Sequence, residues 1–359
     1  MIGERVKLAR HAAGLSLRGL QDKIGNRVSA QAIGKYERNE DMPSSGVLIA
    51  LSDALGVSLD YLVGDREMVL EGVDFRKKQI TSKKEQAQIA ARALHVIERY
   101  VTVEQILGLP SAEWDQPRDA PYPVHELSDA DQAAHSLRDA WDLGIDPIPN
   151  LVELLEQHGI KVVVVDSTEN IDGLAANVRR TGKPPVRIIV VRKGVHGERQ
   201  RFSLAHELGH IVTEVEGDDK FREKAAHRFA GAFLMPAEVL WSQVGKHRNS
   251  IGWSELFALK KLLGVSVQAI AYRCRDLGIF PEVLWQRLFQ EFSRRGFRTP
   301  PHYEPNPLRE EEPLRFERLC YRALAENAIS EPKAAELLGT TVRELNQRME
   351  EPVPTGVAE

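Results

Sequence analysis

Two histidines and a glutamate share one short apolar stretch of the chain, at His206, Glu207 and His210. Positions i and i+4 lie one above the other on a helix, so both imidazoles point the same way, at the spacing of two zinc ligands. Glu207 follows the first histidine, where its carboxylate could take a proton from a water on the metal. The flanking segments 201–205 and 211–212 are apolar enough to bury such a helix. The alternative is a chance occurrence of this pattern on an ordinary helix.

A site with two histidines needs a third protein ligand, which leaves the fourth position on zinc for water. Glu223 is the natural choice, because apolar residues from 226 to 233 recur at helical spacing and this glutamate opens that helix. Glu216 and Asp218 in the preceding acidic loop are alternative ligands. A loop holds a ligand less firmly than a helix does.

Several separated blocks of sequence resemble the ImmA/IrrE family of metallopeptidases, and they occur in the order found in that family. The resemblance extends over about residues 135–285 of the chain. The blocks that carry it are 143–162, 199–210, 223–236 and 264–273.

This resemblance implies that His206, His210 and Glu223 bind the metal and that Glu207 is the general base. The chain departs from the family at His227, where relatives usually have Asn. This histidine either takes over the supporting role of that Asn beside the ligands or competes as a ligand itself.

The first 66 residues are predicted to form a separate bundle of short helices. Ser16 and Ser29 are N-cap residues that begin two of these helices. The predicted helices are 5–13, 17–24, 30–38, 45–55 and 58–62. The segments 29–39 and 51–62 resemble the Cro/C1-type helix-turn-helix of XRE-family regulators.

The third predicted helix is the element that would read DNA. Its Gln31 has the amide geometry to pair with adenine in the major groove. Ser29 caps this helix, and Arg27, Lys35 and Arg38 would meet phosphates. Residues 1–66 carry nine Lys/Arg and eight Asp/Glu, so the nonspecific attraction to DNA is weak. The alternative is a helical bundle used only for contact with another protein.

Length and composition agree with a chain of several domains. The 359 residues exceed one compact core of ordinary size, and the net charge of −4 gives no overall basic field. The sequence lacks a signal-peptide pattern and an apolar run of about 18 residues, so we expect a cytoplasmic protein that does not enter a membrane. In such a compartment Cys274 and Cys320 are expected to be buried thiols.

The predicted fold class is α+β. An all-α helix-turn-helix domain (1–66) is followed by a helical connector and a Pro-rich linker (67–123). A zincin-like metallopeptidase domain with a small sheet (124–290) and a helical C-terminal region (300–351) complete the chain. The β-branched runs at 160–166 and 186–191 are predicted strands of the sheet.

Two functions follow from these patterns. The first is a DNA-binding transcriptional regulator with a zinc-dependent endopeptidase domain, which cleaves a repressor or other regulatory protein during stress or mobile-element induction. The second is a regulator whose metal domain is a sensor that does not cleave. A toxin–antitoxin or phage-defence role is a further context. The expected partners are a double-stranded DNA operator, a protein substrate and a second copy of the chain in a homodimer.

Overall fold

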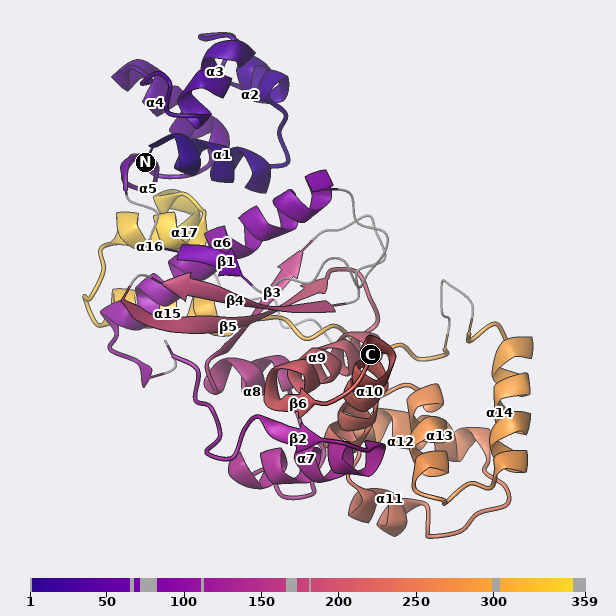
Figure 1. The fold of residues 1–359 in the computed structure, drawn as a ribbon. Coiled ribbons are helices and arrows are strands. Elements are labelled where there is room, and N and C mark those ends of the chain that lie inside the picture. The colour runs from indigo at the N-terminus through magenta and orange to yellow at the C-terminus, as the bar shows by residue number, and fades with distance from the viewer. Residues whose placement is uncertain are drawn as a thin grey trace. The chain divides into compact units, whose positions relative to one another are not determined.

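The computed structural model describes residues 2–64, 68–71, 83–110, 113–165, 173–180, 182–298 and 304–350. These residues divide into two compact units (Figure 1). The first contains residues 1–114, 176–187 and 314–359, and the second contains residues 115–175 and 188–313. The charged stretch 72–82 of the predicted connector lies outside the described residues.

The N-terminal bundle of the first unit forms as the sequence predicts, from α1 to α5. Ser16 Oγ accepts from the backbone N–H of Gly19 at the start of α2, and Ser29 Oγ accepts from Ala32 at the start of α3. The core of the bundle is apolar, with Leu20, Ile33 and Leu51 among its fully buried residues. The helices are α1 (Ile2–Ala12), α2 (Leu17–Lys23), α3 (Ala30–Glu37), α4 (Ser45–Leu55) and α5 (Leu59–Val63).

A long helix and the C-terminal helices complete the first unit. The predicted helical connector contains α6 (Lys83–Ile106), in which Tyr100 and Val103 are buried against Cys320 and its neighbours. The predicted helical C-terminal region is confirmed as α15 (Arg315–Ala325), α16 (Glu331–Leu338) and α17 (Val342–Glu350).

An ion pair, a hydrogen bond and a ring contact connect the N-terminal bundle with this second group of helices. Arg5 Nη1 lies 2.6 Å from Glu98 Oε2 of α6, and both side chains are largely buried. Ser58 Oγ, just before α5, donates to Glu336 Oε1 of α16 at 2.9 Å. The ring of Tyr61 in α5 meets the edge of His95 in α6, with ring centroids 5.5 Å apart.

One sheet has the strand order β1-β4-β5-β3. Its strands are β1 (Met68–Glu71), β3 (Ile160–Val165), β4 (Gly173–Arg180) and β5 (Lys183–Arg192), and β1 runs antiparallel to β4. The strands expected at 160–166 and 186–191 are confirmed as β3 and β5. Strand β4 was not predicted. Its sequence mixes glycine, alanine and arginine, which hides the alternation of a half-buried strand.

The second unit is mainly helical. Within the segment that we expected to be a linker, β2 (Tyr122–Val124) instead pairs in parallel with β6 (Thr213–Val215). The helices of this unit are α7 (Leu127–Ala140), α8 (Leu151–Gln157), α9 (Gly197–Val212), α10 (Asp219–Leu234), α11 (Ala237–Gln243), α12 (Trp253–Leu263), α13 (Val267–Asp276) and α14 (Glu282–Arg294).

Helices α9 and α10 lie side by side in this unit (Figure 1). A glycine permits their close approach, because a Cβ on Gly209 would lie 3.0 Å from Cδ1 of Phe229. Phe229 is fully buried, and it packs on Phe233 one turn further along α10 with ring centroids 5.7 Å apart. The glycine between Glu207 and His210 therefore sets the spacing of the two helices.

The segment 304–313 packs along the N-terminal half of α9. The side-chain amide of Gln200 forms two hydrogen bonds with the backbone of Glu311. It donates to the carbonyl oxygen at 2.9 Å and accepts from the N–H at 2.7 Å. At Gly197 a Cβ would lie 2.0 Å from the carbonyl oxygen of Arg309, so only glycine fits there. The second unit thus includes this segment.

Carboxylates of the same segment pair with buried groups of the second unit. Glu311 forms an ion pair with Arg201 of α9, and its other oxygen accepts from the N–H groups of Leu151 and Val152 at 2.8 and 2.9 Å. A carboxylate at this position satisfies free N–H groups at the start of α8 and complements the helix dipole.

A buried lysine also connects the segment 304–313 with α9. Lys260 Nζ lies 2.5 Å from Glu198 of α9 and 3.1 Å from Glu304 of the segment. All three residues are at most 6% exposed, so each charge depends on the other two for compensation.

None of the described helices combines the length and apolar character that a membrane-spanning helix requires. Cys274 and Cys320 are buried free thiols, as predicted, and burial raises the pKa of each to about 12. Neither thiol is therefore a nucleophile near neutral pH.

Candidate metal site and nucleic-acid interface

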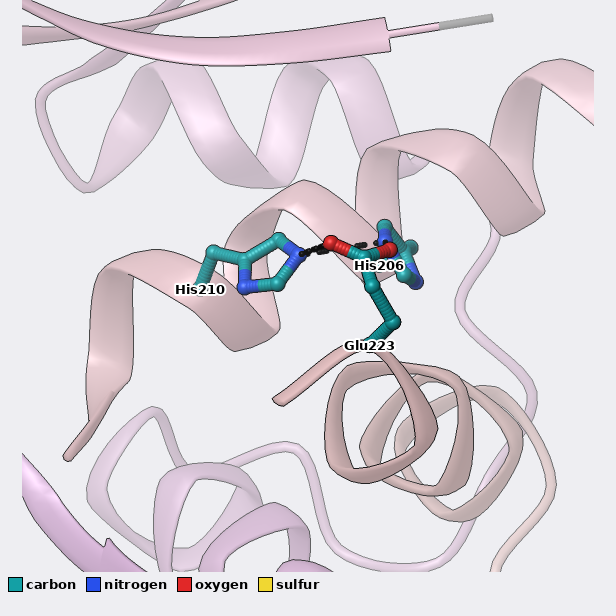
Figure 2. A group of neighbouring side chains, drawn as sticks. All are labelled: His206, His210 and Glu223. Atoms are coloured by element: carbon teal, nitrogen blue, oxygen red, sulfur yellow. Dashed lines mark hydrogen bonds and ion pairs between the residues drawn. The ribbon is translucent and has the colours of Figure 1, made fainter. Parts of the chain in front are cut away.

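Two adjacent helices bring together the three residues predicted as metal ligands. His206 and His210 project from one face of α9, and Glu223 reaches toward both from the second turn of α10 (Figure 2). Oε2 of Glu223 lies 3.2 Å from Nε2 of His206, and Oε1 lies 3.4 Å from Nε2 of His210. The two Nε2 atoms are 3.2 Å apart.

These separations fit a single metal ion with tetrahedral ligands. Zinc at about 2.0–2.1 Å from nitrogen and oxygen ligands holds those atoms roughly 3.3 Å from one another. The donor set of two imidazoles and one carboxylate is also that of a zinc site with an open position. His206 is buried, whereas the side chains of His210 and Glu223 are 26% and 41% exposed, so the cluster is open to solvent on one side.

The electrostatics of the cluster favour an ionised carboxylate. Hydrogen bonds with His206 and then His210 hold the pKa of Glu223 well below its usual range, and burial opposes them with a smaller effect. A ligand carboxylate has to be ionised to bind a metal ion, so Glu223 is already in its binding form.

Glu207 lies on a different side of α9 and is only 5% exposed. Its Oε2 accepts a hydrogen bond from the backbone N–H of Ala175 in β4, at 2.9 Å. Gly173, two residues earlier in the same strand, faces the glutamate side chain so closely that a Cβ there would lie 3.1 Å from Cγ of Glu207. The sequence pattern missed both strand residues, because β4 itself was not predicted.

His227 is exposed and lies beside the cluster, one turn after Glu223 on α10. Its ring packs against the ring of His206, with centroids 4.4 Å apart, and it also faces Phe202 at 5.8 Å. Its nitrogens do not join the group formed by the three ligand atoms among the described residues. The ring of His227 therefore contacts one of the three candidate ligands.

The two alternative ligands take other roles in the described structure. Asp218 is the N-cap of α10, and its carboxylate accepts from the N–H of Phe221 at 2.8 Å. Glu216 is largely exposed and pairs with His125 at 3.3 Å. The helix, rather than the loop before it, supplies the carboxylate of the cluster.

The predicted DNA-reading residues lie on and around α3. Gln31 and Lys35 are exposed and one turn apart, so they share a face of the helix. Arg27 and Ser29 are exposed at the start of α3, where Ser29 acts as the N-cap. Arg38, just after the helix, is paired with Glu40 through two contacts of 2.6 and 2.8 Å. Because Arg38 and Glu40 are both exposed, a phosphate could replace this carboxylate at little cost.

One residue that supports this surface was missed from the sequence. The side chain of Gln21 in α2 accepts from the N–H of Ala30 at 2.8 Å and donates to Asn26 in the intervening turn, also at 2.8 Å. It therefore fixes the start of α3 relative to α2. A polar residue on the inner side of the first helix of such a pair is the signal that could have identified it.

Comparisons with known proteins agree with this division of the chain. Residues 155–275 match the peptidase family described as the IrrE N-terminal-like domain, and residues 6–62 match the family described as helix-turn-helix. A stretch of 63 residues is 40% identical to a Bacillus subtilis (strain 168) protein, the SPbeta prophage-derived uncharacterized HTH-type transcriptional regulator YonR. This stretch is 18% of the present chain and spans 56% of that regulator.

Both resemblances predicted from the sequence are confirmed by these matches. The chain thus contains a segment similar to helix-turn-helix domains and, further along, a segment similar to the IrrE N-terminal-like domain. The predicted α+β class, with a helical N-terminal domain, a small sheet and a helical C-terminal region, is also confirmed.

Proposed function

We propose that this protein is a DNA-binding transcriptional regulator whose second domain is a zinc-dependent endopeptidase. Its substrate is a repressor or another regulatory protein, cleaved during stress or mobile-element induction. One observation carries the proposal: the ligand atoms of His206, His210 and Glu223 converge within 4.8 Å of one another. Glu207 stands beside the first ligand on the same helix.

Each residue has one role in the proposed reaction. His206, His210 and Glu223 hold zinc, which supplies the Lewis acidity that activates a water molecule and polarises the scissile carbonyl. Glu207 accepts the proton of the attacking water and then delivers it to the leaving amine. His227 supports His206 through the packing of the two rings.

The burial of Glu207 is consistent with a base rather than a surface charge. A carboxylate that is 5% exposed and bonded to a strand N–H is held in one place. A general base has to lie within about 2.6–3.2 Å of the proton that it removes, so fixed placement contributes directly to the rate.

Substitution of the base tests the peptidase function. The purified, zinc-loaded protein is incubated with repressors encoded near its own gene, and cleavage is followed by gel electrophoresis and mass spectrometry. Glu207→Gln keeps the size of the side chain but removes the base, so cleavage should fall by about 100-fold or more while zinc remains bound. Glu216→Gln, in the exposed loop, is the matched control and should cleave normally.

The same variant separates cleavage from sensing. If Glu207→Gln regulates transcription in cells as the unsubstituted protein does, the metal domain acts as a sensor and the peptidase function is wrong for that role. The double-stranded DNA operator and the homodimer are proposed from the helix-turn-helix domain, because such domains usually read two-fold operators as dimers. The proposed location is the cytoplasm, where the protein would meet that DNA.

A further inference from the structure

The side chain of Glu207 contacts the backbone of β4 at two residues, Gly173 and Ala175. The N–H of Ala175 donates to Oε2 at 2.9 Å. A Cβ on Gly173 would lie 3.1 Å from Cγ, 3.4 Å from Oε1 and 3.6 Å from Cβ of Ser203. The side chain of Glu207 therefore occupies the space beside Gly173 that any other residue would fill.

The constraint at position 173 is space and not backbone freedom. Gly173 is absent from the glycines with positive φ in the described chain, so its backbone suits an L-amino acid. The first contact that a methyl group would meet, at 3.1 Å, is closer than ordinary van der Waals contact. Either the glutamate or the strand has to shift by a few tenths of an ångström to accept alanine.

We propose that Gly173 and the backbone N–H of Ala175 are positioning elements for the proposed general base, and that they fix its carboxylate relative to the metal ligands on α9. This inference rests on the proposed function. Glu207 is held by a strand that is distant in sequence, whereas His206 and His210 are held by α9 itself. A change in β4 should therefore displace the base while the metal site stays intact.

The size of the effect follows from how sharply proton transfer depends on distance. A misplacement of about 1 Å can cost roughly 100-fold in rate. The shift imposed by Gly173→Ala is smaller, so we expect a loss of about 10-fold, and Gly173→Val should lose more. The loss should appear in kcat rather than KM, because the strand acts on the base.

A probe that needs no substrate provides the direct test. Acetohydroxamic acid chelates zinc through its two oxygens and gives up its hydroxyl proton to a neighbouring base, so its affinity reports where that base lies. Binding is measured by calorimetry on the zinc-loaded full chain, beside the zinc affinity and the melting temperature of each variant. Gly252→Ala is the matched control, because a Cβ there meets nothing within 4 Å among the described residues.

We expect Gly173→Ala to bind zinc normally and acetohydroxamic acid about 10-fold more weakly, in the same direction as Glu207→Gln. The inference is overturned if Glu207→Gln weakens the hydroxamate and Gly173→Ala does not, and this outcome leaves the peptidase proposal standing. It is also overturned if Gly173→Ala loses zinc affinity, which indicates a general structural role. If Glu207→Gln itself leaves hydroxamate affinity unchanged, the role of the base in the proposed function fails, and the inference fails with it.

Discussion

The surface of α3 and the cluster between α9 and α10 present their side chains in opposite ways. Gln31 and Lys35 are exposed on one helix, whose start is held by a hydrogen bond between Ala30 and Gln21 of α2. The metal cluster draws ligands from two helices, and the proposed base beside it is held by a strand. The first site needs a correctly folded helix, whereas the second needs several elements at a correct distance from one another.

The segment 304–313 is a further element that contacts α9, beside α10 and β4. It pairs with Arg201 and Gln200 in the N-terminal half of the helix that carries the histidines. The helix that carries these histidines therefore contacts residues about a hundred positions away in sequence. Changes far from the cluster should weaken its domain, whereas the surface of α3 should respond only to changes in α3 and at its contact with Gln21.

The largest effect is expected from removal of a ligand. His206→Ala leaves one histidine and Glu223, so stoichiometric zinc binding should be lost, because even changes to groups behind the ligands cost about 10–100-fold in metal affinity. Metal analysis of the purified protein measures this. Gln31→Ala should keep its zinc, and full zinc occupancy in His206→Ala would show that the cluster is not the metal site.

The second largest effect concerns the anchor of the 304–313 segment. Glu311→Ala leaves Arg201, whose side chain is 7% exposed, buried without its carboxylate. The free energy of unfolding should fall by about 3–5 kcal/mol. Urea denaturation followed by tryptophan fluorescence measures the change. The neighbouring Glu312 is exposed, so Glu312→Ala should change stability by less than about 0.5 kcal/mol. Equal effects of the two substitutions would contradict the anchoring role.

The third prediction concerns the contact of the N-terminal bundle with α6. Burial, and then the charges of Arg99 and Arg5, lower the pKa of His95 from 6.5 to about 4. As the pH falls below 6.5, His95 becomes protonated in the unfolded chain but stays neutral in the folded protein. This difference lowers the free energy of unfolding progressively until the pH reaches about 4. The loss should be about 2 kcal/mol near pH 5.

His95→Gln should remove this part of the pH dependence, measured as the difference between urea midpoints near pH 7 and pH 5. His135 is the control, since its side chain is 56% exposed and it pairs with Asp139. An unchanged pH dependence in His95→Gln would indicate that the bundle and α6 are not held together through this contact.

The most local effects are expected on the proposed DNA-binding surface. Gln31→Ala should weaken specific binding by about 1–3 kcal/mol and relax the preference for its base, because it removes a paired amide from the major groove. Lys35→Ala should weaken all sequences alike and reduce the salt dependence. Footprinting and binding titrations on the protein's own promoter region measure both. Protection that is unchanged in Gln31→Ala would point to a bundle used for protein contact.

The sequence predicted the parts of the molecule whose signals are local. N-caps at Ser16 and Ser29 began helices where expected, because a serine hydroxyl satisfies N–H groups only two or three residues away. The three proposed ligands could be named for a similar reason: two of them lie one turn apart on a helix, and the third follows on the next helix. The family matches then confirmed the two domains that these patterns indicated.

Only the tertiary structure decided what surrounds those residues. The pairing of Glu207 with Ala175 joins residues on different elements, and no short pattern marks Ala175 as the partner of that glutamate. The contacts of Glu311 and Glu304 arise from a proline-broken segment whose sequence gives no periodic signal. Their cause is the burial of Arg201 and Lys260, and a buried charge takes its partner from whichever part of the chain the fold brings to it. The identity of that part is set by the packing of distant elements and not by the residues next to the charge.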